Sequence, residues 1–441
     1  MINTQEIRKF FPAIMSGRVL SNNAASTQAP VQLLELLNKL MAEYDNVHRG
    51  QSKSSMLTTE RFEASYDTIA QFIGAPSRKN IILYKNATEA INSVMYSLMT
   101  EFKDGDNVVA TLMEHNSNYV PWYGLCNEIL PKFGIKAECR LAKFDKETGQ
   151  LDLEHLKSLI DERTKIVCVV GASNFLGTKN PIKKIRKLAN ASGYVQPNGE
   201  KKSYLLIDGA QLVPNVFVDV KELDVDFLAW SFHKMMAPFG VGALYAKEDL
   251  LLGMRPFLYG GDMIAEGQVT PEKVGYNALP WKFTAGTPNI LGTILSAQAL
   301  RLLMDFSLDS GKYAYFLTDK KLESQDVKKA MDSIEVHEKY LIGGAMDIME
   351  SMPTAYVYGP KNPGERTPLI SFNCSQNNPF KIAERLNGLG IESRAGCHCA
   401  TLAHHYYQLN PPASCRLSFY AYNSIEDVEK ACSAVKKVLN N

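Results

Sequence analysis

An acidic residue and a lysine follow two successive strand-like segments of this sequence. The first segment ends in Asp208, and the second is followed by Ser231, His233 and Lys234. Ligand sites in open α/β sheets gather at the carboxyl ends of strands, so we expect these side chains to lie close together. Pyridoxal 5'-phosphate needs a lysine that forms a Schiff base and an acid that keeps the pyridinium nitrogen protonated. Alone, either residue is more simply a turn cap or a surface lysine, but the set predicts a site for this cofactor.

A phosphate site is indicated after another strand-like run. Asn86, Ala87 and Thr88 stand where the run 81–84 gives way to a helical pattern. The N–H groups at a helix N-terminus suit a phosphate. By itself the motif is at least as often a plain N-cap.

A third group of reactive residues lies near the C-terminus. Residues 394–400 read Arg-Ala-Gly-Cys-His-Cys-Ala, with His404 and His405 close by. A zinc site is one interpretation, although zinc ligands usually come as Cys-x-x-Cys pairs. Two structural cysteines are another, since free cysteines are often buried. A third interpretation, a reactive thiolate, depends on the family resemblance described below.

The pattern of elements predicts how these residues are positioned. From about residue 60 to about 300, strand-like apolar runs alternate with amphipathic helical patterns, which is typical of a mostly parallel sheet covered on both faces. The expected strands are 81–84, 107–111, 166–170, 204–208, 226–230 and 243–245, and the expected helices include 89–99, 154–161, 181–191 and 290–306. The turn-forming, charged segment 194–203 is expected to be an exposed excursion.

A second α/β rhythm runs from about residue 340 to the end. We therefore predict an α/β protein with a large domain that contains the mostly parallel sheet, at residues 23–300, and a smaller α/β domain at residues 301–441. Residues 1–22 are expected to form an N-terminal arm that packs on the small domain.

Composition excludes several classes of protein. The 441 residues include 48 Lys+Arg and 47 Asp+Glu, and a net charge of +1 argues against a chain that coats nucleic acid or anionic lipid. The N-terminus lacks the pattern of a secretory signal, and no apolar run approaches the roughly 20 residues that span a bilayer. Eight cysteines are too sparse for a disulfide scaffold. We expect a cytoplasmic protein with reduced thiols that binds no nucleic acid and no membrane.

The sequence resembles the class V aminotransferase family of fold-type I pyridoxal phosphate enzymes, and within it the Suf-type cysteine desulfurases and selenocysteine lyases. The resemblance covers nearly the whole chain. Besides the Asp208 and Lys234 motifs, it rests on segments 21–27, 47–50, 113–118, 120–122, 173–177, 283–289, 394–400 and 415–416, in the same order and at similar spacing.

The resemblance implies a role for each residue of the cofactor site. Lys234 is the Schiff-base lysine, Asp208 pairs with the pyridine nitrogen, and Gln211 bonds the phenolic oxygen of the ring. The remaining implied contacts are ring stacking and proton transfer by His115, a place beside ring and substrate for Asn174, and phosphate binding by Thr88, Ser231 and His233, with Thr287 supplied by the partner of a homodimer. Many relatives carry two hydroxyl residues where this chain has Ala87 and Thr88, so one phosphate contact is expected from backbone N–H.

The resemblance also implies the reaction. Arg416 and Arg394 clamp the carboxylate of L-cysteine, a task that suits a bidentate guanidinium. Cys399 attacks the substrate sulfur and becomes a persulfide, and the product is L-alanine. The loop from Cys399 to Arg416 is short, as in the Suf-type branch, which suggests that sulfur leaves to a sulfur-acceptor protein that approaches the site. No metal is expected.

Other reactions share the same cofactor residues. Selenocysteine lysis, transamination, epimerisation and C–S cleavage of a different amino acid all use Lys234 and Asp208, and only Cys399 separates them from desulfuration. A catalytically silent scaffold for sulfur-transfer partners is the alternative from another class. Cys397 and the pair Tyr406–Tyr407 receive no role from the sequence.

Overall fold

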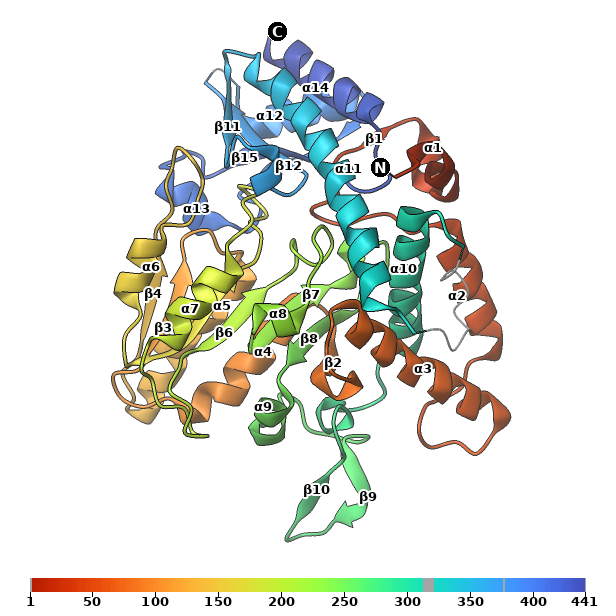
Figure 1. Ribbon diagram of the computed structural model, residues 1–441, viewed down its shortest axis with the longest axis vertical. Coiled ribbons are helices and arrows are strands. Elements are labelled where there is room, and N and C mark those ends of the chain that lie inside the picture. Colours follow the sequence, from red (N-terminus) through yellow and green to blue (C-terminus); the bar gives the residue numbers. More distant parts are fainter. Residues whose placement is uncertain (1, 312–320, 376, 441) are drawn as a thin grey trace.

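The computed structural model describes residues 2–311, 321–375 and 377–440 (Figure 1). Its helices are α1 (Thr4–Ile7), α2 (Val31–Glu43), α3 (Lys53–Phe72), α4 (Ala87–Leu98), α5 (Asn116–Gly124), α6 (Leu153–Leu159), α7 (Ile182–Asn190), α8 (Val220–Leu223), α9 (Glu248–Gly253), α10 (Ile290–Leu308), α11 (Ser324–Glu350), α12 (Pro379–Gly388), α13 (Thr401–Tyr406) and α14 (Ile425–Leu439). Its strands are β1 (Val19–Leu20), β2 (Ile81–Tyr84), β3 (Asn107–Thr111), β4 (Glu138–Ala142), β5 (Thr164–Val170), β6 (Tyr204–Asp208), β7 (Phe227–Ser231), β8 (Gly242–Ala246), β9 (Ile264–Val269), β10 (Val274–Tyr276), β11 (Ala355–Tyr358), β12 (Leu369–Cys374), β13 (Ile391–Glu392), β14 (Arg394–Gly396) and β15 (Ser414–Ser418).

The large sheet has seven strands in the order β2-β8-β7-β6-β5-β3-β4. Strands β7, β6, β5, β3 and β4 are parallel, and β8 runs antiparallel to both β7 and β2. The predicted mostly parallel sheet is confirmed, and all six predicted strands lie within two residues of observed ones. The edge strand β4 was not predicted, because its residues Glu138 and Arg140 break the apolar pattern.

Both faces of this sheet are buried, which explains its nearly continuous apolar strands. In β5, Val167 and Val169 face one apolar core, whereas Ile166 and Cys168 face the other. The helix α10 lies in the first core and packs on α2, α3 and α11. By length and composition α10 is able to cross a membrane, but 89% of its most apolar window is buried inside the protein.

The smaller sheet is antiparallel, in the order β11-β12-β15-β14. Helix α11 packs on β11 and β12, and α12 packs on β14 and β15, so the smaller α/β unit has its own apolar core. Near the N-terminus, Arg8 forms an ion pair with Asp427 and β1 pairs with β13. Helix α10 continues across residue 300. The predicted domain limits at 22 and 300 stay predictions.

The segment 194–203 is only partly the exposed excursion that we expected. Residues 197–201 include an exposed tip, but Tyr194 and Gln196 are buried. The Tyr194 hydroxyl donates to Asp106 at 2.9 Å, and the Gln196 amide donates to the Lys165 carbonyl at 2.9 Å. Turn-forming residues therefore predicted the path of the segment, whereas the two side chains that anchor it carry no local signal.

Candidate active site

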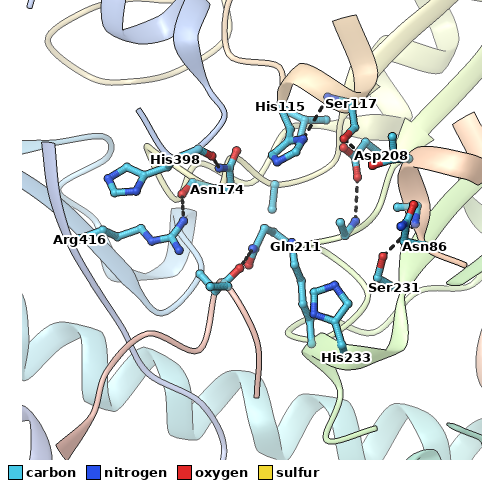
Figure 2. Close-up of a pocket in the computed structure, with 18 of the residues that line it drawn as sticks. Asn86, His115, Ser117, Asn174, Asp208, Gln211, Ser231, His233, His398 and Arg416 are labelled. Atoms are coloured by element: carbon cyan, nitrogen blue, oxygen red, sulfur yellow. Dashed lines mark hydrogen bonds between the residues drawn. The ribbon is translucent and has the colours of Figure 1, made fainter. Parts of the chain in front are cut away.

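A pocket of about 220 Å³ lies at the carboxyl ends of the parallel strands (Figure 2). Val170, Asp208 and Ser231 are the last residues of β5, β6 and β7, and all three line it. The smaller sheet contributes Arg394 and Arg416 from the opposite side. Parallel strands of similar length thus bring residues far apart in the chain to one edge.

The structure brings most of the predicted site residues together in this pocket. The lining includes Thr88, His115, Asn174, Asp208, Gln211, Ser231, His233, Lys234, Arg394 and Arg416. Two predicted residues are outside the lining: Thr287 is exposed before α10, and Cys399 is half-buried beside the lining residue His398. Cys399 is nevertheless close enough to interact electrostatically with Lys234 and Arg416.

Lys234 and Asp208 form an electrostatic pair at the base of the pocket. Burial lowers the pKa of the Lys234 ammonium to about 8, and the Asp208 carboxylate opposes that shift. Burial raises the pKa of Asp208. The Ala210 N–H, which donates to Asp208 Oδ1 at 3.0 Å, and the positive charge of Lys234 both act to lower it. A lysine amine that deprotonates near pH 8 is suited to proton transfer and to bond formation with a carbonyl carbon.

The start of helix α4 forms a cradle for an anion. The Ala87 N–H donates to Ser231 Oγ at 2.9 Å, and Asn86 caps the helix. A Cβ atom on Gly242 would lie 2.4 Å from Asn86 Cα, so only glycine allows β8 to approach the helix start this closely. Nδ1 of His233 is buried and has no hydrogen-bond partner among the described residues. These features fit a bound phosphate group.

The Thr88 hydroxyl lies beside the same helix start. Its Oγ1 is 2.7 Å from Ser117 Oγ, in the first turn of α5. Sequence reasoning did not assign a role to Ser117, although it lies within the segment 113–118 that carries the family resemblance. The hydroxyl pair therefore connects the starts of α4 and α5 at the pocket.

His115 is a neutral ring directed into the pocket (Figure 2). Its Nδ1 accepts the Ser117 N–H at 3.1 Å, so the ring proton is on Nε2. Burial lowers the pKa of His115 to about 3, and the positive charges of Lys234, Arg394 and Arg416 act in the same direction. An uncharged imidazole suits stacking on an aromatic cofactor ring and donation of a hydrogen bond from Nε2.

Gln211 and Asn174 connect the pocket to its surroundings. The Gln211 amide donates to the Ala24 carbonyl at 2.6 Å, which leaves its second N–H for a ligand. The Asn174 amide donates to the His398 carbonyl at 2.5 Å, while its Oδ1 is buried without a partner in the described part of the chain.

Arg416 supplies a buried cation. Burial lowers the pKa of Arg416 to about 9, and the positive charge of Arg394 acts in the same direction. Its Nη1 donates to the Asn174 carbonyl at 2.8 Å, and its Nε has no partner among the described residues. Within those residues no acidic side chain forms an ion pair with Arg394 or Arg416. A buried guanidinium without a counter-charge is suited to a carboxylate ligand.

Residues 397–400, which we call the Cys399 turn, have an unusual backbone. The Ala400 N–H donates to the Cys397 carbonyl at 2.8 Å, and the two central residues, His398 and Cys399, have φ values of 51° and 58°. This pattern of a type I′ turn normally favours Asn or Gly. Left-handed positions cost other residues on the order of 1–3 kcal/mol each and persist only where the surroundings impose them.

The histidines near the Cys399 turn are hydrogen-bonded to a serine hydroxyl, which matters for the zinc site considered as one interpretation of the sequence. His398 and His404 both direct Nε2 at the Ser414 hydroxyl. No group of three or more His, Cys, Asp or Glu side chains in residues 2–311, 321–375 and 377–440 is arranged to hold a metal ion. All eight cysteines are described, and each is a free thiol. Sequence reasoning missed Ser414, because a lone serine in an apolar strand carries no functional signal.

Tyr406 and Tyr407 pack the helix that follows the Cys399 turn. The two rings lie 5.0 Å and 5.5 Å from the ring of Phe144, and the Tyr407 hydroxyl donates to the Lys146 carbonyl at 2.8 Å. The aromatic pair, for which sequence reasoning found no role, therefore packs the end of α13 against the segment that follows β4.

The residues present fit pyridoxal phosphate and an amino-acid substrate. The pocket combines a lysine and a carboxyl group at adjacent strand ends with a helix N-terminus and an unpaired imidazole nitrogen. It also holds a neutral ring for stacking and a buried cation for a carboxylate. This donor set matches the needs of the cofactor.

Comparison with known proteins identifies similar chains. The model of the family described as Aminotransferase class-V matches residues 19–325 and 319–431. The cysteine desulfurase of Haloferax volcanii is 38% identical over 421 residues, which cover 95% of this chain and 88% of that protein. The cysteine desulfurase of Cronobacter sakazakii is 34% identical over 441 residues, 98% of each chain. The apo structure of a cysteine desulfurase from Thermococcus onnurineus is similar with a TM-score of 0.85 and 28% identity, over 100% of this chain and 98% of that one.

Proposed function

This chain belongs to the aminotransferase class-V family, and we propose that it is a pyridoxal phosphate-dependent cysteine desulfurase. Family membership supports the cofactor and the fold, and the similarity to cysteine desulfurases along nearly the whole chain supports the reaction. The observation that carries the choice of reaction is the half-buried thiol of Cys399 at the edge of the pocket, within electrostatic reach of Lys234. Class V enzymes that transfer no sulfur have no need of a thiol at this position.

The cofactor is held by the residues of the strand ends and of the α4 start. Lys234 would bond it covalently, Asp208 would pair with its ring nitrogen, and His115 would stack on its ring. When bound, pyridoxal phosphate withdraws electrons from the Cα of the amino acid. Its phosphate group would be held by Thr88, Ser231 and His233, with one further contact from a backbone N–H of the helix start.

The substrate is oriented by its carboxylate. Arg416 and Arg394 present guanidinium groups that have no acidic partner of their own in the described chain. Asn174 contacts Arg416 through its carbonyl and the Cys399 turn through its side chain, so it joins the carboxylate site to the nucleophile. A substrate held in this way presents its Sγ atom to the turn.

Two side chains of the protein perform the chemical steps. The Lys234 amine, with its pKa lowered to about 8, takes the proton from the Cα of L-cysteine. The thiolate of Cys399 then attacks Sγ, so that an S–S bond forms while the bond between Cβ and Sγ breaks. The electron pair of the broken bond stays with the carbon skeleton, which takes up one proton at Cβ and regains one at Cα, and it leaves as L-alanine while the sulfur stays as a persulfide on Cys399.

The first test is the stoichiometry of the products. With L-cysteine and a reductant, the wild type should release equal amounts of alanine and sulfide, because the reductant frees the outer sulfur of the persulfide. Cys399→Ala should keep the visible absorption of bound pyridoxal phosphate and lose both products, whereas Cys397→Ala serves as the matched control. Full desulfurase activity in Cys399→Ala would contradict the assignment, and activity on selenocysteine alone would favour the lyase alternative.

We further propose that the active unit is a homodimer in which Thr287 contacts the phosphate in the partner's pocket. Thr287 is exposed and does not line the pocket of its own chain. The β9–β10 hairpin projects from the large domain (Figure 1), and its residues Val269, Val274 and Tyr276 are exposed. Sedimentation velocity should give a dimer, and mixing Lys234→Ala with Thr287→Ala subunits should restore one intact site per heterodimer.

The persulfide is proposed to pass to an acceptor protein in the cytoplasm. The Cys399 side chain is half-buried in a turn held by hydrogen bonds, so the acceptor must approach the site. Eight free thiols fit a reducing compartment. Neither nucleic acid nor a membrane is expected as a partner, because the net charge is +1.

A further inference from the structure

A buried serine bridges two histidines behind the Cys399 turn. The Ser414 hydroxyl lies 3.0 Å from Nε2 of His398 and 3.0 Å from Nε2 of His404. His404 Nδ1 is 2.9 Å from the Ala400 carbonyl, at the end of the turn. Ser414 and His404 are fully buried, and His398 is 2% exposed. The three side chains therefore form one continuous hydrogen-bonded chain that begins and ends in the turn.

The direction of each hydrogen bond follows from the Ala400 carbonyl, at which this chain of hydrogen bonds ends. A carbonyl only accepts, so His404 Nδ1 carries the proton that it donates to Ala400. A neutral His404 then accepts at Nε2, and the Ser414 hydroxyl is the donor there. Ser414 Oγ in turn accepts from Nε2–H of His398. Both rings are neutral, since burial lowers the pKa of His404 to about 4 and that of His398 well below its ordinary value.

Ser414 also lies on the strand that carries the carboxylate site. Residues two apart in a strand face the same side, so Ser414 and Arg416 project from the same face of β15. Arg416 donates to the Asn174 carbonyl, and Asn174 donates to the His398 carbonyl. The contacts close a ring from Ser414 to His398, to Asn174, to Arg416 and back along β15. Figure 2 shows the His398 ring directed away from the centre of the pocket while its carbonyl faces Asn174.

We propose that Ser414 and His404 are positioning residues that hold Cys399 at a fixed distance from the substrate carboxylate. The inference rests on the desulfurase function proposed above. The left-handed backbone at His398 and Cys399 is unfavourable alone and needs neighbours that impose it. The Asn116 N–H fixes the Cys399 carbonyl at 2.6 Å, and the Ser414 chain fixes the residues on both sides of Cys399. Strand β15 thereby positions both the substrate, through Arg416, and the attacking Cys399 thiolate, through Ser414.

The test separates positioning from substrate binding. Ser414→Ala should lower kcat for L-cysteine about tenfold to a hundredfold, because small misplacements of a nucleophile have effects of this size. The KM for L-cysteine and the visible absorption of the bound cofactor should change little, since Arg416 and the cofactor contacts are untouched. Ser414→Thr keeps the hydroxyl and should recover most of kcat. His404→Phe keeps a ring against Phe175 and gives an independent test with the same expected loss.

A control and a second readout complete the experiment. Ser203→Ala removes another fully buried hydroxyl, which bonds the Thr164 carbonyl far from the turn, and should leave kcat unchanged. The alkylation rate of Cys399 by iodoacetamide, mapped by peptide mass spectrometry, should change severalfold in Ser414→Ala and not in Ser203→Ala. If both Ser414→Ala and His404→Phe keep the kcat and the Cys399 alkylation rate of the wild type, the proposal is overturned. Absence of desulfurase activity in the wild type overturns the proposed function instead, and the alkylation result still decides the positioning.

Discussion

The two ends of the pocket are built in different ways. Asp208, Ser231 and Lys234, which we call the cofactor floor, lie at the carboxyl ends of two adjacent parallel strands, and none of them has a left-handed backbone. The Cys399 turn has two left-handed non-glycine residues and is held by hydrogen bonds from Asn116, Asn174 and the Ser414 chain. A regular sheet is enough to position the cofactor, whereas the nucleophile depends on side chains from distant segments. Substitutions should therefore separate the two ends.

The largest effect is expected from Lys234→Ala on the cofactor floor. Loss of the amine that takes the Cα proton should lower kcat by about 10²–10⁴-fold. The visible absorption of the cofactor should also change, because the covalent link to the protein is lost, and this distinguishes the floor from the turn, where Cys399→Ala leaves the absorption intact. Lys183→Ala, at an exposed lysine of α7, is the matched control. Retained turnover in Lys234→Ala would contradict the separation of roles.

This contrast also explains how far the sequence predicted the molecule. Asp208 and Lys234 were recognised because apolar strand patterns end beside them, and the fold class followed from the same alternation of elements. Cys399 and Arg416 were assigned only through the family resemblance. The Ser414 chain was missed, because contacts between residues 398, 404 and 414 arise from packing and leave no periodic pattern.

A smaller effect is expected where the two ends meet, at Arg416. Arg416→Lys keeps the charge but loses the bidentate geometry and the bond from Nη1 to the Asn174 carbonyl. A hydrogen bond to a charged group contributes about 1.5–3 kcal/mol, so kcat/KM for L-cysteine should fall on the order of tenfold to a hundredfold. Steady-state kinetics with purified enzyme measure this change.

The control for Arg416→Lys is a ligand without a carboxylate. Cysteamine inhibition should be nearly the same in the variant and the wild type, because this molecule offers nothing to the guanidinium. An equal loss of affinity for cysteamine and for L-cysteine would show that Arg416 supports the fold of the site and not the carboxylate.

The smallest effects concern stability, and here the two ends should respond to pH in opposite directions. Glu114 interacts electrostatically with Asp208 of the cofactor floor, and its carboxyl oxygens are hydrogen-bonded to the Thr111 hydroxyl at 2.6 Å and the Asn118 amide at 2.7 Å. Burial raises its pKa to about 8. Between its ordinary value and about pH 8 the unfolded chain loses this proton and the folded chain keeps it, so the free energy of unfolding falls as pH rises. In the Cys399 turn, burial lowers the pKa of His404 to about 4, so the free energy of unfolding falls as pH drops below about 6.5.

Each dependence is removed by one substitution. Glu114→Gln keeps one acceptor and one donor, as in the protonated carboxyl. Its free energy of unfolding relative to the wild type should rise between about pH 5 and about pH 8, with a limiting slope of about 1.4 kcal/mol per pH unit. His404→Phe lacks the hydrogen bonds of His404 at every pH, so its free energy of unfolding should be lower than that of the wild type. This difference should shrink as pH falls from about 6.5 towards 4, because the wild type itself loses stability there. Calorimetry of both variants and the wild type across this range measures the two difference curves. A difference curve for Glu114→Gln that is flat above pH 5 would mean that Glu114 is ionised in the folded protein, and the cofactor floor would then hold a second buried negative charge beside Asp208.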